Sequence, residues 1–193
     1  MTRIIGGNLR GRNLKVPDSV TRPTSSRVRE AVFSSVEHAV SGLSDLRVLD
    51  LFAGSGALGI EAISRGAAEV VLIEKDLRAA DVLHTNIADL KVENARVVIA
   101  DVLQEVKQNS TRGKFDVVFV DAPYVSTDDE VAEVISGLAS NNWLAEYAVL
   151  VVERGSKSVV TWPNSYEELR KKVYGDTAIW YGQYIGTDKK ELA

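Results

Sequence analysis

The stretch that most constrains this chain of 193 residues runs from Val48 to Gly59 and reads VLDLFAGSGALG. It begins with apolar residues typical of a strand, is interrupted by glycines, and continues with a helical pattern. Glycines allow a tight turn and let a ligand approach the backbone closely. The first turn of the following helix offers unpaired N–H groups and the positive end of its dipole. The stretch therefore predicts a cofactor-binding loop at the carboxyl end of the first strand of an open α/β sheet.

Acidic residues at the ends of two further apolar runs complete this predicted cofactor site. Glu74 lies 20 residues after Gly54, where such sites place the acceptor for a ribose hydroxyl. Asp101 follows the run 96–100, and its carboxylate would accept from an adenine amine while the Val102 N–H serves a ring nitrogen. The alternative is that Asp101 caps a helix at 102–108. The predicted cofactor-binding residues are Asp50, Phe52, Ala53, Gly54, Ser55, Gly56, Glu74, Lys75, Asp101 and Val102.

The glycine loop alone does not distinguish a dinucleotide from S-adenosylmethionine, and a second motif decides between them. Asp121-Ala122-Pro123-Tyr124 follows the apolar run 115–120. Methyl transfer to the exocyclic amine of a base requires that the nitrogen lone pair face the donor methyl. A carboxylate from Asp121 and the backbone carbonyl of Ala122, both accepting N–H groups of the amine, would orient it and favour the positive charge that develops there. The face of Tyr124 would hold the base by stacking.

Composition and charge limit the remaining functions. The chain has no cysteine, which excludes disulfides, thiolate zinc sites and a cysteine nucleophile. Its two histidines make a histidine-based metal site implausible, and we expect no metal and no membrane span. The net charge is −4, but residues 1–29 hold seven basic residues against one aspartate. This asymmetry predicts a basic arm on an acidic catalytic body. The arginines assigned to RNA contact are Arg3, Arg10, Arg12, Arg22, Arg27 and Arg29.

The pattern along the chain predicts an α/β fold with a mostly parallel sheet. Strands are expected at 47–52, 69–74, 96–100, 115–120 and 148–152, with helices at 57–65, 76–90, 102–108 and 128–139 between them. Residues 171–181 read as an antiparallel hairpin around Gly175-Asp176. A further hairpin is expected within residues 1–22, and a helix that one of Thr24, Ser25 or Ser26 caps should follow it. We therefore expect a basic arm over 1–22 and a methyltransferase domain over 23–193.

The order of these motifs resembles a known family. It is similar to Class I S-adenosylmethionine-dependent methyltransferases, and more closely to the bacterial RsmD family of small-subunit ribosomal RNA guanine-N2 methyltransferases. The resemblance rests on four blocks: residues 3–12 (RIIGGNLRGR), 22–30 (RPTSSRVRE), 50–59 (DLFAGSGALG) and 121–124 (DAPY). It implies a Rossmann-like sheet of seven strands with helices on both faces, S-adenosylmethionine as cofactor, and Asp121 with the following carbonyl at the target amine. It also implies a cytoplasmic enzyme, expected to be a monomer, whose substrate is 16S ribosomal RNA in the 30S subunit or an assembly intermediate.

One departure from the family keeps alternatives open. The family has a proline where this chain has Ala122, so one fixed φ angle and some loop stiffness are lost, although the backbone carbonyl remains. A non-catalytic RNA-binding assembly factor is therefore one alternative. DNA adenine-N6 methylation is another, because it uses the same tetrapeptide, although 193 residues leave little room for a target-recognition segment. A nicotinamide-dependent oxidoreductase would leave the Asp121–Tyr124 motif without a use.

Overall fold

The structure is a computed structural model, and it describes residues 2–17 and 25–186. The chain divides into two compact units, Met1–Asp101 and Val102–Ala193, whose elements are taken in turn. The first unit contains β1 (Thr2–Arg3), β2 (Asn13–Leu14), α1 (Ser26–Val40), β3 (Arg47–Leu51), α2 (Ala57–Ser64), β4 (Glu69–Glu74), α3 (Leu77–Leu90) and β5 (Ala95–Ile99). The second contains α4 (Val102–Val106), β6 (Phe115–Asp121), α5 (Asp128–Ser140), β7 (Leu144–Gly155), β8 (Tyr166–Tyr174) and β9 (Thr177–Tyr184).

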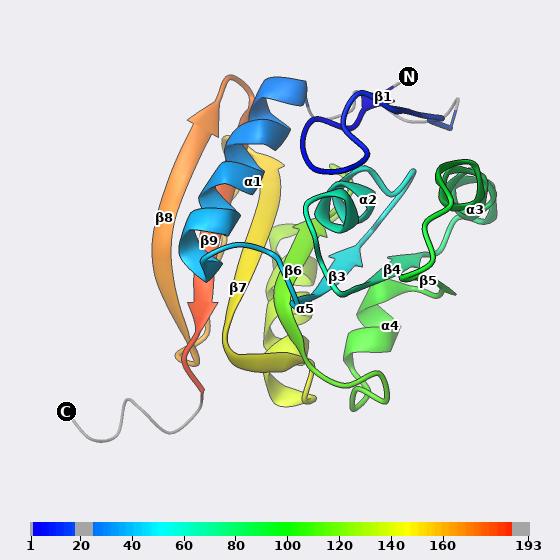
Figure 1. Ribbon diagram of the computed structural model, residues 1–193. Helices are drawn as coiled ribbons and strands as arrows, with labels where there is room; N and C mark the ends of the chain where they lie inside the picture. The colour runs from blue at the N-terminus through cyan, green and yellow to red at the C-terminus, as the bar shows by residue number, and fades with distance from the viewer. Residues whose placement is uncertain (1, 18–24, 187–193) are drawn as a thin grey trace. The chain divides into compact units, whose positions relative to one another are not determined.

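The strands form the predicted α/β sheet (Figure 1). Its seven strands follow the order β5-β4-β3-β6-β7-β9-β8, and β1 and β2 form a separate two-stranded antiparallel sheet. Within the first unit β4 pairs in parallel with both β3 and β5. Within the second, β6 and β7 are parallel, whereas β9 pairs antiparallel with β7 and β8. The fold class is therefore confirmed, including the C-terminal hairpin and the small N-terminal one.

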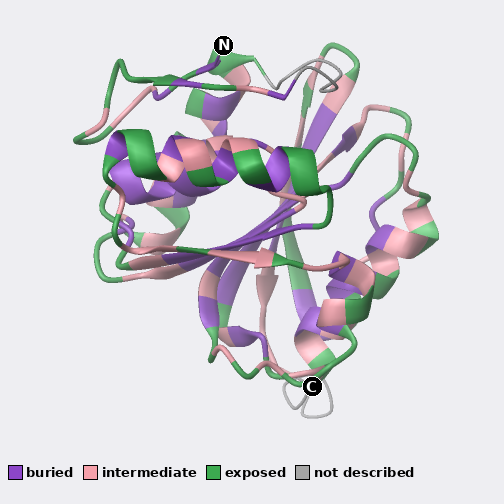
Figure 2. Cartoon of the chain, turned by 90° about the vertical axis from the view of Figure 1, so that its right-hand side faces the viewer, coloured by how far each residue is buried: buried purple, intermediate pink, exposed green. Residues whose placement is uncertain are grey.

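Burial explains why the strands were readable from the sequence. Val70–Ile73 in β4 and Val117–Val120 in β6 are buried on both faces of the sheet, as is expected of parallel strands covered by helices. Figure 2 shows these strands in the buried colour, while the helices alternate between buried and exposed residues. In α1 the buried apolar residues include Val32, Phe33 and Val36, whose spacing places them on one face of the helix.

Side-chain caps fix where three helices begin. Ser25 accepts a hydrogen bond from the Val28 N–H at the start of α1, so Ser25 is the cap among the three candidates. Asp76 caps α3 in the same way through the Ala79 N–H. At α5, Thr127 and Glu130 form a reciprocal capping box. The last of these caps matters for function because it immediately follows the Asp121–Tyr124 motif.

The predicted strand at 148–152 is too short. β7 runs from Leu144 to Gly155, and its pairing with β6 changes register between Phe115 and Val117. The exposed residues Glu146 and Tyr147 interrupt the apolar run, and Tyr147 has a φ angle of 63°. A bulge of this kind breaks the alternation that identifies a strand in sequence.

No helix within residues 2–17 and 25–186 has the length and apolar character needed to cross a membrane.

Candidate functional site

The glycine loop lies between β3 and α2, as predicted. Phe52, Gly54 and Gly56 all have positive φ angles, of 61°, 55° and 79°. At Gly56 a Cβ atom would lie 2.3 Å from Leu83 Cδ1, so packing as well as backbone conformation requires glycine there. At Gly54 a Cβ atom would meet nothing nearer than the Phe52 carbonyl oxygen at 4.0 Å. The backbone at Gly54 is therefore free of close side chains on the side where glycine lacks its own.

Gly59 lets α2 pack closely on the sheet and binds the first acid of the site. A Cβ atom at Gly59 would lie 2.6 Å from Leu72 Cδ2 on β4. The Gly59 N–H donates to Asp50 Oδ2 at 2.8 Å, and Asp50 is only 1% exposed. Burial raises the pKa of Asp50 to about 7, the Gly59 hydrogen bond lowers it, and the charge of Glu74 raises it further. Asp50 therefore holds the Gly59 backbone, in the first turn of α2, through a buried hydrogen bond.

Glu74 joins the end of β4 to the glycine loop. Its Oε2 accepts from the Gly54 N–H at 2.8 Å, and its Oε1 accepts from the Asp76 N–H at 2.7 Å. The spacing of 20 residues thus corresponds to a direct contact between Glu74 and the loop. A carboxylate offers about four acceptor positions, so these two bonds leave room for a ribose hydroxyl. Glu74 as the ribose acceptor stays a prediction.

The other predicted cofactor residues lie at the ends of β4 and β5 or in the loop. Lys75 and Asp101 form an ion pair at 3.3 Å, in which the Lys75 side chain is largely exposed and the Asp101 side chain is partly exposed. Ala53 N–H donates to the Ile73 carbonyl at 3.0 Å, and Ser55 is buried. Val102 is the buried first residue of α4. The structure thus brings Asp50, the glycine loop and Glu74 together by hydrogen bonds, and pairs Lys75 with Asp101.

The Asp121–Tyr124 motif begins on the last residue of β6. Ala122 is buried, whereas the Tyr124 side chain is 62% exposed. The Ser126 N–H donates to the Pro123 carbonyl at 2.9 Å, so the motif continues into a tight turn before α5. The guanidinium of Arg154 also binds the Pro123 carbonyl. The turn leaves the aromatic face of Tyr124 in solvent, as stacking on a base requires.

The N-terminal arm carries most of the arginines predicted to contact RNA. Arg3, Arg10 and Arg12 are exposed on it, and Arg27 is exposed on α1. Arg22 lies outside the described residues. Arg29 differs from the others because it is only 2% exposed and donates to Thr2 Oγ1 and to the Arg3 carbonyl. Its position supports anchoring of the arm, so we leave Arg29 out of the RNA surface proposed below.

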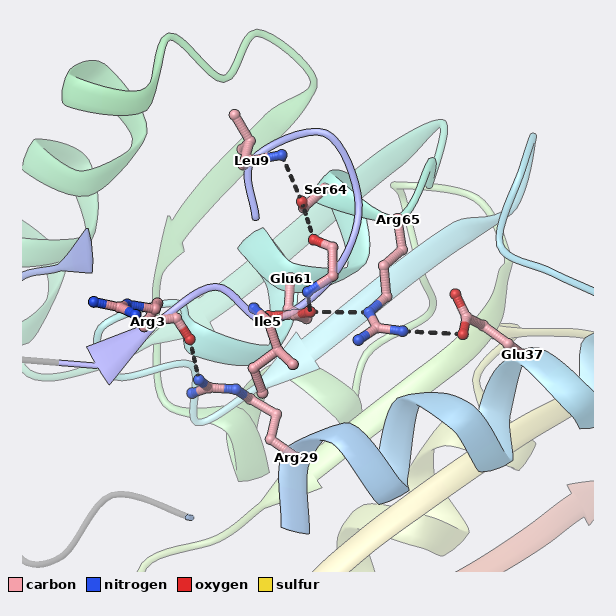
Figure 3. Close-up of polar contacts among 9 residues, drawn as sticks. Arg3, Ile5, Leu9, Arg29, Glu37, Glu61, Ser64 and Arg65 are labelled. Atoms are coloured by element: carbon pink, nitrogen blue, oxygen red, sulfur yellow. Dashed lines mark hydrogen bonds and ion pairs between the residues drawn. The ribbon is translucent and has the colours of Figure 1, made fainter. Parts of the chain in front are cut away.

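A buried polar network on α2, not anticipated from the sequence, holds the arm in place (Figure 3). Glu61 is fully buried and accepts from the Ile5 N–H at 2.8 Å and the Gly6 N–H at 2.7 Å. Arg65 donates to Glu61 Oε1 at 2.9 Å and to Glu37 Oε2 at 3.0 Å. Ser64 Oγ accepts from the Leu9 N–H and donates to the Gly6 carbonyl. The arm is therefore bonded to α2 through its backbone, and of its exposed arginines Arg12 also donates to the Asp89 carbonyl at 3.4 Å.

Asn86 on α3 connects the arm to the glycine loop. Its side-chain amide accepts from the Lys15 N–H at 2.8 Å and donates to the Lys15 carbonyl at 3.0 Å. The same amide nitrogen donates to the Ser55 carbonyl at 3.0 Å. The one sequence signal for this contact is that Asn86 is a polar residue between Leu83 and Leu90 on the apolar face of α3, where both leucines are buried.

The chain matches known proteins over nearly its whole length. The family described as "Conserved hypothetical protein 95" matches residues 2–183. The chain is 43% identical over 178 residues to "Ribosomal RNA small subunit methyltransferase D" of Escherichia coli strain K12, covering 91% of this chain and 86% of the relative. It is 39% identical over 176 residues to the protein of the same name from Haemophilus influenzae, covering 90% and 89% of the two chains.

A solved structure gives the same result. It is an Escherichia coli protein with 40% identity and a TM-score of 0.83, and the match covers 96% of this chain and 99% of that one. The family match spans both the glycine loop and the Asp121–Tyr124 motif. The chain therefore belongs to the RsmD family of S-adenosylmethionine-dependent methyltransferases.

Proposed function

We propose that this protein methylates the exocyclic N2 amine of a guanine in 16S ribosomal RNA. Relatives that match about nine-tenths of the chain carry the name ribosomal RNA small subunit methyltransferase D, which supports the substrate class. The choice of an exocyclic amine rests on the Asp121–Tyr124 motif, where a carboxylate, a backbone carbonyl and an exposed aromatic ring follow one another at the end of β6. This sequence of groups is the observation that carries the proposal.

The residues of the first unit fit S-adenosylmethionine. Gly54 has open space where a side chain would stand, and Glu74 keeps acceptor capacity beside two backbone bonds. We assign the ribose hydroxyls to Glu74, the adenine amine to Asp101 and the adenine ring to the Val102 N–H. When bound, the cofactor supplies an electrophilic methyl group on a sulfonium. The positive end of α2 would stabilise its carboxylate.

Asp121 and Tyr124 act on the base. The Asp121 carboxylate and the Ala122 carbonyl accept the two N–H groups of the guanine amine, which turns the nitrogen lone pair away from both acceptors. Tyr124 stacks on the base and so fixes its plane. The negative charge of Asp121 stabilises the ammonium character that develops on N2 as the new carbon–nitrogen bond forms. The reaction would be one direct displacement, in which the bond between the methyl carbon and the sulfonium sulfur breaks as the carbon–nitrogen bond forms, S-adenosylhomocysteine leaves, and the nitrogen releases its proton to solvent.

The exposed arginines of the arm provide the RNA contacts. Arg3, Arg10, Arg12 and Arg27 all have exposed side chains, and a guanidinium binds phosphate oxygens in a bidentate manner. Arg22 is assigned to the same surface from the sequence alone. We propose that the substrate is the 30S subunit or an assembly intermediate, that the enzyme acts in the cytoplasm where subunits assemble, and that it acts as a monomer.

The test is transfer of a radiolabelled methyl group from S-adenosylmethionine to three acceptors. These are 30S subunits that lack the modification, naked 16S ribosomal RNA and duplex DNA, each digested to nucleosides after reaction. Labelled N2-methylguanosine from the subunits is the expected product. N6-methyladenine from DNA would replace the proposal with DNA methylation. No transfer to any acceptor, with cofactor binding intact, would identify a non-catalytic assembly factor.

A further inference from the structure

Arg154 is a buried arginine next to the Asp121–Tyr124 motif. It is the penultimate residue of β7 and is only 6% exposed. Removing a guanidinium from water is costly unless hydrogen bonds and an opposite charge compensate for the lost hydration. The partners that compensate for the burial of Arg154 therefore show which segment it holds in place.

Acceptors of its guanidinium lie in residues 122–127, which we call the motif loop, and in the first turn of α5. Arg154 Nη1 donates to the Pro123 carbonyl at 3.2 Å. Its Nη2 donates to the Ser126 carbonyl at 2.5 Å and to Asp128 Oδ1 at 3.3 Å. One rigid, planar group thus spans the turn from Pro123 to Asp128.

A second connection ties the same turn to the chain after β7. Asp128 Oδ2 accepts from the Val159 N–H at 3.0 Å, so the two carboxylate oxygens of Asp128 bind different segments. The Val159 hydrogen bond and the Arg154 guanidinium both hold the pKa of Asp128 below its ordinary value. The motif loop is therefore fixed at its far end by Asp128 and along its length by Arg154.

The near end of the motif loop begins at Ala122, which is buried. Alanine has no ring that locks its φ angle, as a proline at this position would. The Pro123 carbonyl that Arg154 binds belongs to the peptide bond leading into Tyr124. Fixing this carbonyl fixes the plane of that peptide, and with it the starting direction of the Tyr124 side chain.

We propose that Arg154 is a positioning residue for methyl transfer, which through the Pro123 and Ser126 carbonyls supplies the rigidity that the proline at position 122 would otherwise give. This inference rests on the proposed role of the Asp121–Tyr124 motif in holding the target amine. In this role Arg154 itself touches neither base nor cofactor. It acts by keeping the Ala122 carbonyl and the Tyr124 ring in the geometry that the amine requires.

Kinetics of two substitutions test the positioning role. Arg154→Met keeps the length and apolar stem of the side chain but removes every donor, and Arg154→Lys keeps the charge but loses the planar fork. Misplacing a reacting group by about 1 Å costs on the order of 100-fold in rate, so kcat of Arg154→Met should fall about 100-fold. Arg154→Lys should retain more activity. The dissociation constant of S-adenosylmethionine should stay within about twofold, because the glycine loop is unchanged.

The decisive readout is rescue by Ala122→Pro. If Arg154 and a proline at 122 supply the same rigidity, the loss of kcat that Arg154→Met causes should be at least about fivefold smaller when both proteins also carry Ala122→Pro. Equal effects of Ala122→Pro in both proteins would overturn the proposal. A kcat of Arg154→Met within twofold of the parent would overturn it as well. Arg112→Met, which removes a guanidinium paired with Glu105 in the same unit, controls for general loss of stability.

Hydrogen exchange separates this inference from the proposed function. The Ser126 amide is bonded to the Pro123 carbonyl, so its exchange should accelerate in Arg154→Met, while amides of β9 keep their parent rates. Unchanged exchange at Ser126 would overturn the anchoring role of Arg154. If the parent protein transfers no methyl group to any RNA, the proposed function fails, and the exchange rates still decide whether Arg154 holds the motif loop.

Discussion

Replacing Glu61 with alanine should both destabilise the protein and release its N-terminal arm. The Glu61 carboxylate is fully buried and accepts hydrogen bonds from the Ile5 N–H, the Gly6 N–H and Arg65 Nε. Glu61→Ala leaves all three donors without their acceptor. The alanine side chain has no acceptor atom, so it cannot replace the carboxylate.

The magnitude follows from the number of donors and their exposure. A buried donor that loses its partner costs about 1–3 kcal/mol. Ile5, Gly6 and Arg65 are only half-buried, so water can reach them once the carboxylate is gone, and the low end of that range applies. Three donors at about 1 kcal/mol each give a loss of about 3 kcal/mol in the free energy of unfolding. For a domain of ordinary stability this is a large fraction of the total.

Urea denaturation at neutral pH measures this loss, and Glu37→Ala is the matched control. Glu37 binds the same arginine at 3.0 Å, but its side chain is 34% exposed. An ion pair that reaches solvent contributes about 0–1 kcal/mol, so Glu37→Ala should cost less than about 1 kcal/mol. Amide exchange at Ile5 and Gly6 should accelerate in Glu61→Ala only. A cost below about 1 kcal/mol for Glu61→Ala, or exchange at these amides unchanged, would refute the reasoning.

Three further predictions concern Asp50 in the first unit and the Asp121–Tyr124 motif in the second. Because burial raises the pKa of Asp50 to about 7, the folded protein keeps a proton that the unfolded chain releases from about pH 4 upward. The stability of the parent relative to Asp50→Asn should therefore fall by about 3 kcal/mol between pH 4 and 7, because the slope reaches about 1.4 kcal/mol per pH unit only between the two pKa values, and urea denaturation that gives a constant difference across this range would contradict the assignment. Asp121→Ala should lower methyl transfer at least about 100-fold while the cofactor dissociation constant by calorimetry stays within about twofold; if both are lost, Asp121 is structural. Tyr124→Leu should raise KM for RNA about 10-fold because it removes base stacking, whereas Tyr124→Phe keeps the ring and should not raise KM. Equal effects of the two substitutions on KM would show that stacking is not the function of the ring.

The fold was predictable because its signals are local. Apolar runs such as 70–73 and 117–120 are buried on both faces, and such runs identify parallel strands without knowledge of their neighbours. Gly54 and Gly56 are required by their positive φ angles, and Gly59 by its close approach to Leu72 on β4. The limits of β7 were missed because a bulge interrupts the pattern that defines it.

The parts that escaped prediction depend on partners far apart in the chain. Arg29 was assigned to RNA because a positive charge near a helix N-terminus is unfavourable, but its acceptors, Thr2 and the Arg3 carbonyl, lie 27 and 26 residues away. Glu61 lies among Ile60, Ala62 and Ile63, where a carboxylate needs buried donors, but the sequence does not show which donors these are. A charged residue within an apolar helical stretch is a usable signal for such anchors.

The contacts of Asn86 decide how far the N-terminal arm is separable from the rest of the first unit. One buried amide bonds both to the backbone of Lys15 and to the Ser55 carbonyl in the glycine loop. A chain trimmed to start at residue 25 would lose the donors to Glu61 and the Lys15 partner of Asn86 in one cut. The truncation would then remove the arginines of the arm and also a hydrogen-bonded partner of the residue that binds the glycine loop. The arm is thus an integral part of the first unit, and experiments that ask what it contributes to RNA binding should replace its exposed arginines one at a time and leave its backbone whole.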